Sequence, residues 1–288
     1  MSEPASKTPM NKAPTNKTSK NKTLYVVQLN FPRGLEAISN RRFDYEHVPD
    51  LLSCDGFVGL DRFHLADIEP TQWPRAPRRI EYMNLWQLEG PEVLASEAYR
   101  LRSNGPDPSW QGRTNQHRYH ALRERQRKME GLPAPAPQVG PRRVWDRRPM
   151  PWLRPHGATM PPPRSVFAVF YDVALTHEDE VNAVMDEETV PELLGCPGFL
   201  GCERYTAVDV PLGPGHTTAR NEPITAVQHM DIYDLTSIEV MLSDEYCAQR
   251  DNPSARAQRI EPLMTLVERG VFYQRSSPWA ITANPGNP

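Results

Sequence analysis

One pattern occurs twice in the chain, and this repeat limits the possible folds more than any other feature of the sequence. Residues 40–63 align without gaps with residues 182–205. The shared positions carry acidic residues, a proline, a cysteine, glycines, an aromatic residue and an arginine: Asp44/Asp186, Glu46/Glu188, Pro49/Pro191, Cys54/Cys196, Gly56/Gly198, Phe57/Phe199, Gly59/Gly201 and Arg62/Arg204. Because an internal repeat reflects a repeated structural unit, the sequence predicts two related halves.

The flanking segments extend the match and indicate what each half folds into. Runs of β-branched and aromatic residues predict strands, and apolar residues at helical spacing follow the first and third strand of each half. The pattern therefore predicts that each half forms a β-α-β-β-α-β, ferredoxin-like unit. Pro49 and Pro191 are expected to end the first helix of each half, because the residue before a proline avoids helical angles. The predicted strands are 24–30, 57–63, 81–88 and 143–147 in the first half and 166–173, 199–205, 228–235 and 271–275 in the second.

The domain boundaries follow from this alignment and from the distribution of the 31 prolines. We expect a disordered tail, a first repeat with a basic helical insertion and a Pro-rich segment from residue 131, a Pro-rich linker, a second repeat and a C-terminal tail. In that order the main segments are 1–23, 24–148 (insertion 110–130), 149–165, 166–276 and 277–288. An exposed apolar sheet face in each half must be covered. The prediction is therefore an α+β fold whose two repeats pack sheet to sheet as an intramolecular barrel.

Composition excludes several classes of function. A net charge of -3 does not favour nucleic acid as a partner. No apolar run reaches the roughly 18 residues of a membrane span, and the first residues lack a secretory pattern, so a cytoplasmic location is expected. The basic segment 110–130 is typical of a solvated helix face, with an anionic partner as the alternative. His117 and His120 are spaced to share a metal ion, but no third ligand is evident, so no metal site is predicted.

The third strand of each half alternates between two kinds of side chain. Met83 and Leu85 recur as Met230 and Ile232, and these aliphatic residues are expected to face the helices. The other positions carry aromatic and polar groups that would suit a ligand cavity between the two sheets. The predicted substrate-binding residues are Tyr82, Asn84, Trp86, Asp231 and Tyr233.

Histidines are the candidates for proton transfer. His47 precedes Pro49, and an imidazole with an ordinary pKa near 6.5 can donate or accept a proton at neutral pH. Asp44, one helical turn earlier, could orient the ring. The second half has Thr189 in place of His47, so only one such site is expected; capping of a helix end by His47 remains an alternative. His229, with Asp231 two residues on, is a second catalytic candidate. Arg62 and Arg204 are expected to pair with acidic residues.

Residues 43–49, Phe-Asp-Tyr-Glu-His-Val-Pro, together with the doubled strand and helix pattern, resemble the dimeric α+β barrel superfamily and within it the EthD-like group. The resemblance implies a hydrophobic aromatic or polyketide-like substrate and proton transfer without a cofactor. The implied enzymes are lyases, isomerases, cyclases or cofactor-free monooxygenases. The histidine of that group maps onto His47.

Two other functions are compatible with the sequence. Related barrels built from tandem halves bind haem through a histidine, for which His229 is a candidate. The chain could also be a non-catalytic protein that binds a small ligand or assembles with a partner through segment 110–130. Pairing of whole barrels into a homodimer is compatible with either.

Overall fold

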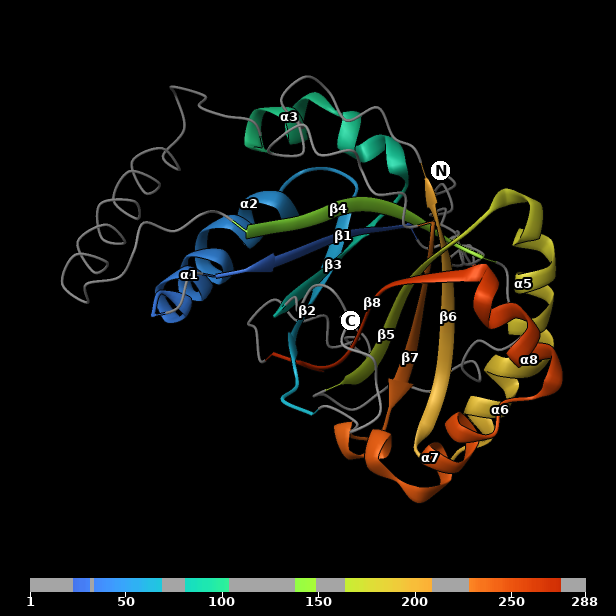
Figure 1. The fold of residues 1–288 in the computed structure, drawn as a ribbon. Helices are drawn as coiled ribbons and strands as arrows, with labels where there is room; N and C mark the ends of the chain where they lie inside the picture. Colours follow the sequence, from blue (N-terminus) through green and yellow to red (C-terminus); the bar gives the residue numbers. More distant parts are fainter. Residues whose placement is uncertain are drawn as a thin grey trace, which may run out of the picture.

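The structure is a computed structural model that describes residues 23–31, 34–68, 81–103, 138–148, 164–208 and 228–275. Each half has the predicted order of strands and helices (Figure 1). The first half contains β1 (Thr23–Asn30), α1 (Glu36–Arg42), the π-helix η1 (Phe43–His47), α2 (Val48–Leu52), β2 (Phe57–Leu65), β3 (Tyr82–Leu88), the 3-10 helix η2 (Pro91–Ala95), α3 (Glu97–Ser103) and β4 (Gln138–Arg147). The second contains β5 (Ser165–Val173), η3 (Leu175–His177), α5 (Glu178–Val184), the π-helix η4 (Met185–Thr189), α6 (Val190–Gly195), β6 (Phe199–Val208), β7 (His229–Leu235), η5 (Ile238–Leu242), α7 (Asp244–Asp251), α8 (Ala255–Ile260), η6 (Glu261–Leu263) and β8 (Met264–Gln274).

The eight strands form one closed antiparallel barrel in the order β1-β3-β2-β8-β5-β7-β6-β4, which β4 closes by pairing with β1. The two halves meet at two seams. At one seam β2 pairs with β8, with His64 opposite Tyr273. At the other β4 pairs with β6, with Val144 opposite Val208. The predicted α+β barrel made from two repeats of one chain is therefore confirmed.

The helices lie outside the barrel, and Figure 1 shows α1 and α2 on one side and α5, α6 and α8 on the other. Each helical layer packs on its own half of the barrel through a separate apolar core. A third core fills the barrel interior and draws residues from all eight strands. It consists of Leu24, Val26, Phe63, Met83, Leu85, Trp145, Val166, Ala168, Phe170, Tyr205, Met230, Ile232 and Phe272.

The predicted direction of the alternating strand faces is wrong. Met83 and Leu85 point into the barrel rather than toward the helices, and so do their counterparts in β7. Trp86 and Tyr233 belong instead to the two helix-side cores. The interior of an eight-stranded barrel is just wide enough for side chains to fill it, so the aliphatic face forms that core. The predicted cavity between the sheets, lined by aromatic and polar residues, is therefore not what these residues form.

The prolines do not end the first helices. Pro49 and Pro191 lie in the first turn of α2 and α6, and the chain is helical on both sides of each. Proline lacks a backbone N–H, which is tolerated at a first helical turn. A π-helical turn precedes each proline. His47 consequently lies within a continuous helical segment instead of at a helix end.

Gly56 and Gly198 make the turns into β2 and β6. Their φ angles are 88° and 96°, in the left-handed region that glycine adopts without strain. A Cβ at either position would lie 2.4 Å from a Cγ2 of Val93 or Val240. The two glycines therefore fix both the chain direction and the close approach of η2 and η5 in the same way in each half.

Other expectations fall partly or wholly outside the described residues. The strands β4 and β8 are longer than the predicted 143–147 and 271–275. The residues that the structure describes do not include the insertion 110–130, the linker 149–163, most of the two tails, or residues 69–80 and 209–227 between the second and third strands of each half. Within the described residues, none of the helices combines the length and apolarity that crossing a membrane requires.

Candidate functional site

A buried arginine anchors the sheet to the first helix in both halves. Arg62 and Arg204 are 1% and 0% exposed and point from β2 and β6 toward the helices. Each donates to one residue of the third strand and to two residues of the helical segment. The acceptors of Arg62 are Asn84 Oδ1 at 3.0 Å, Asn40 Oδ1 at 2.9 Å and Asp44; those of Arg204 are Asp231 Oδ1 at 3.0 Å, Asn182 Oδ1 at 3.0 Å and Asp186. The predicted pairing of both arginines with acidic residues is confirmed.

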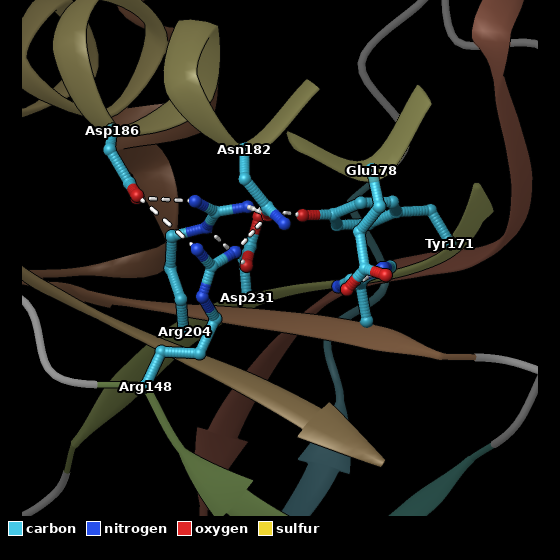
Figure 2. Close-up of polar contacts among 8 residues, drawn as sticks. Arg148, Tyr171, Glu178, Asn182, Asp186, Arg204 and Asp231 are labelled. Carbon is cyan, nitrogen blue, oxygen red and sulfur yellow. Dashed lines mark hydrogen bonds and ion pairs between the residues drawn. The ribbon is translucent and has the colours of Figure 1, made fainter. Parts of the chain in front are cut away.

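The second half adds aromatic and ionisable groups to this arrangement (Figure 2). The Tyr171 hydroxyl accepts a hydrogen bond from Arg204 Nη2 at 2.7 Å. The Tyr171 ring stacks on His229, with centroids 5.1 Å apart and ring planes inclined by 18°. Glu178 Oε1, at the start of α5, lies 3.7 Å from His229 Nε2. A histidine, a tyrosine and a carboxylate therefore lie together where β5, β7 and α5 meet.

His229 is the unusual member of this group. It is 1% exposed, yet neither ring nitrogen has a hydrogen-bond partner among the described residues. Burial, followed by the charges of Arg204 and Arg148, lowers the pKa of His229 from 6.5 to about 4. The imidazole is therefore neutral at pH 7. A buried polar group without a partner costs roughly 1–3 kcal/mol, and such groups need a functional explanation more often than others.

Burial and neighbouring charges also shift the pKa values of the groups around His229. Burial raises the pKa of Asp231, and Arg204 opposes this rise. Burial alone would lower the pKa of Arg204, but Asp231 and Tyr171 outweigh it, so the pKa of Arg204 is raised. Burial also raises the pKa of the Tyr171 hydroxyl. Arg204 and Tyr171 therefore keep their protons across the physiological range, and His229 is the neutral nitrogen base of this cluster.

The first half of the chain completes this cluster through Arg148, which follows β4. Arg148 donates to Asn182 Oδ1, and its Nη2 lies 3.5 Å from Asp186 Oδ2. Its backbone N–H donates to the carbonyl of Arg204 at 2.9 Å. Pairing of β4 with β6 at the seam brings Arg148 to this place. The candidate site of the second half is thus formed by both halves.

The candidates from the first half lie under the other helical layer. The His47 ring is 5.0 Å from that of Phe43 and 6.1 Å from that of Trp86. Asp44 accepts a hydrogen bond from Arg62. Tyr82 accepts one from Asn40 Nδ2 at 3.3 Å. Asp44, His47, Tyr82, Asn84 and Trp86 therefore belong to one helix-side cluster, whereas His229, Asp231 and Tyr233 belong to the other.

Sequence reasoning singled out His229 and Asp231 but missed Tyr171, Glu178 and Arg148. One signal was present for Tyr171, because the aligned position in the first half is Leu29. No comparable signal was present for Arg148, whose partners depend on how the barrel closes. Among the described residues no group of three or more His, Cys, Asp or Glu side chains is placed to hold a metal ion. His117 and His120 lie outside those residues.

Comparison with solved structures finds several similar chains. An anthrone oxidase-like protein shares 12% identity over 90% of this chain and 92% of its own, with a TM-score of 0.50. A candidate monooxygenase from Lactobacillus acidophilus NCFM shares 8% identity over 88% of this chain and 93% of its own, with a TM-score of 0.39. A variant of chlorite dismutase from Candidatus Nitrospira defluvii shares 8% identity over 90% and 93% of the two chains, with a TM-score of 0.46.

No protein-family model and no curated protein sequence matches the chain. At such identities the structural likeness shows the fold alone. That fold is an α+β barrel of ferredoxin-like halves, and the likeness does not single out the EthD-like group.

Proposed function

We propose that this chain is a small-molecule enzyme that uses general acid–base catalysis without a bound cofactor, and that His229 is the proton-transferring group. The observation that carries the proposal is the buried, neutral imidazole with two unbonded nitrogens. The site lies between the sheet and α5 of the second half. This proposal replaces the expected cavity between the sheets and gives His229 the role that the sequence favoured for His47.

A base whose pKa is about 4 is weak, so the arrangement suits abstraction of a C–H or O–H proton only where the anion that forms is stabilised by neighbouring positive charge. A neutral imidazole takes up the proton, and Glu178, with Oε1 3.7 Å from Nε2, stabilises the imidazolium that forms. The substrate is left as a carbanion, enolate or phenolate. Arg148 and Arg204 disfavour a positive charge on His229. The same two arginines favour a negative charge on a substrate bound beside it.

The subsequent step depends on the substrate. In an isomerase or cyclase the imidazolium returns the proton to another substrate atom, and in a lyase to the leaving group. In a cofactor-free monooxygenase the carbanion reacts with dioxygen. A hydrophobic aromatic or polyketide-like substrate is compatible with all of these reactions. The structural neighbour described as anthrone oxidase-like makes anthrones the first compounds to test.

A substrate panel with matched histidine variants tests the proposal. The purified chain is incubated with anthrones and other enolisable polycyclic phenols, and turnover is followed by absorbance and by dioxygen uptake. Replacing a general base lowers the rate by about 10²–10⁴-fold, so His229→Gln should lose that much kcat. His47→Gln is the matched control. Loss in His47→Gln with full activity in His229→Gln would move the catalytic role to the first half.

The pH profile provides a second discriminating measurement. A base whose pKa is about 4 stays neutral down to low pH, so kcat/KM should be flat between about pH 5 and pH 8. A base with the ordinary pKa near 6.5 would instead lose half of its activity at that pH. Saturable binding of panel compounds without any turnover would favour the non-catalytic, ligand-binding function.

Haem binding is the second candidate, because a neutral imidazole with an unbonded nitrogen is also a good iron ligand. Glu178 Oε1 lies 3.7 Å from Nε2, and the carboxylate would have to move for an iron atom to bind there. We therefore place the cofactor-free proposal first. An absorption spectrum of the protein after incubation with haemin distinguishes the two. A Soret band that His229→Gln abolishes would favour haem.

A further inference from the structure

Arg275 is the counterpart of Arg148 at the opposite seam of the barrel. In the sequence repeat, residues 142–148 align with residues 269–275. The Arg275 backbone N–H donates to the carbonyl of Arg62 at 2.9 Å, just as that of Arg148 donates to Arg204. Each half therefore sends an arginine to the helix-side cluster of the other half.

The two arginines differ in what their side chains find there. Arg148 contacts Asn182 and Asp186. The Arg275 guanidinium carbon instead lies 5.6 Å from the centroid of the Tyr82 ring. Its buried Nε has no hydrogen-bond partner, and Arg275 forms no ion pair with a carboxylate in the part of the chain that the structure describes. A half-buried cation without a counter-charge is a natural place for an anion to bind.

Further aromatic rings adjoin Tyr82, the ring that lies against this guanidinium. The Tyr82 ring contacts Phe31 and His64, with both centroid distances at 4.8 Å. The Tyr273 hydroxyl is hydrogen-bonded to His64 Nδ1 at 2.8 Å, and Tyr273 is 39% exposed. Strand alternation places Tyr273 and Arg275 on the same outer face of the β2–β8 seam. An aromatic surface that solvent can reach therefore adjoins the uncompensated charge.

The charges nearby are compatible with a bound monoanion. Burial, followed by the charge of Arg275, lowers the pKa of His64, while Glu81 acts in the opposite direction. Arg62, the next cation, already pairs with Asp44. Arg275 also works to lower the pKa of Arg62, which shows that the two positive charges are close. An anion on Arg275 would relieve this repulsion.

We propose that Arg275 binds the carboxylate of a small aromatic acid whose ring packs against Phe31 and Tyr273, which unlike Tyr82 are not fully buried. This site lies at the β2–β8 seam and is separate from the proposed catalytic site at His229, so it goes beyond the proposed function. Its ligand is set by two features on the same face: a guanidinium for a carboxylate and flat rings for an aromatic body.

Titration of the full chain with sodium benzoate tests this site. Binding is followed by calorimetry and by the NMR signals of His64, assigned with a His64→Gln variant. Benzoate should bind saturably and raise the pKa of His64, because the added negative charge favours the imidazolium. Arg275→Gln should weaken benzoate binding at least tenfold and remove the pKa change. Arg148→Gln is the matched control at the other seam and should leave the His64 response intact.

Acetate and a ring variant separate the two parts of the site. Acetate should bind at least tenfold more weakly than benzoate, and Phe31→Leu should lower the affinity for benzoate several-fold while leaving that for acetate unchanged. An unmoved His64 signal at high benzoate concentration would overturn the proposal. So would wild-type affinity in an Arg275→Gln protein whose thermal unfolding shows it to be folded. None of these results depends on catalysis at His229.

Discussion

The two helix-side clusters share a framework but differ in the residues added to it. Both halves fix the sheet to the helical segment through a buried arginine, an aspartate and an asparagine at equivalent positions. The first half then has the neutral Asn84 and Tyr82 where the second has Asp231 and His229. The residues that are the same in both halves therefore form the structural part of each cluster. The residues that differ are the ones available for chemistry.

Removing the two arginines should produce the largest effects and tests whether the frameworks are equivalent. Arg204→Leu removes the ion pairs of Arg204 with the buried Asp231 and with Asp186, which keeps its contact with Arg148, and breaking a buried ion pair costs about 3–5 kcal/mol. Arg62→Leu removes an ion pair with only one carboxylate, that of Asp44, and should be less destabilising. The free energy of unfolding in urea gives both values. Equal losses would mean that the exchange of Asn84 for Asp231 has no energetic consequence.

The pH dependence of stability sharpens the comparison at the histidine. The folded pKa of His229 is about 4, below the unfolded value of 6.5, so the unfolded chain binds the extra proton first as pH falls. Stability should therefore be complete above pH 6.5 and decrease toward pH 4, by up to about 3 kcal/mol from this residue. Urea unfolding at several pH values should show a shallower slope in His229→Gln than in the natural chain. Identical slopes would mean that His229 is not buried as a neutral group.

The fold could be predicted because its signals are local and repeated. Gly56 and Gly198 occupy equivalent turns. The alternation of aliphatic and polar residues along the third strands shows that each strand has two unlike faces, wherever the helices lie. Alternation does not say which face is inside. Met83 and Leu85 became barrel core because two apolar sheet faces met, and Asn84 could turn toward the helices because Arg62 was there to bind it.

The site was predictable only where its residues lie on one strand. His229 and Asp231 are two apart on β7, so the pattern that drew attention to one included the other. Glu178 comes from the start of α5, and Arg148 crosses from the other half through the β4–β6 seam. Those contacts depend on the register in which eight strands close, and that register is set by packing over long sequence separations.

The smallest expected effect is on the free energy of unfolding when Arg148 or Arg275 is replaced. The two substitutions should change it in different directions. Arg148→Gln removes a partly buried ion pair with Asp186 and should destabilise the fold by about 1 kcal/mol. Arg275→Gln removes a charge that has no carboxylate partner among the described residues and that lies close to Arg62. It should therefore leave the free energy of unfolding unchanged or raise it by up to about 1 kcal/mol. The comparison requires low salt, because screening weakens both terms. If Arg275→Gln were the more destabilising of the two, the Arg275 guanidinium would stabilise the β2–β8 seam. Its role would then be structural, and it would not be an anion-binding group.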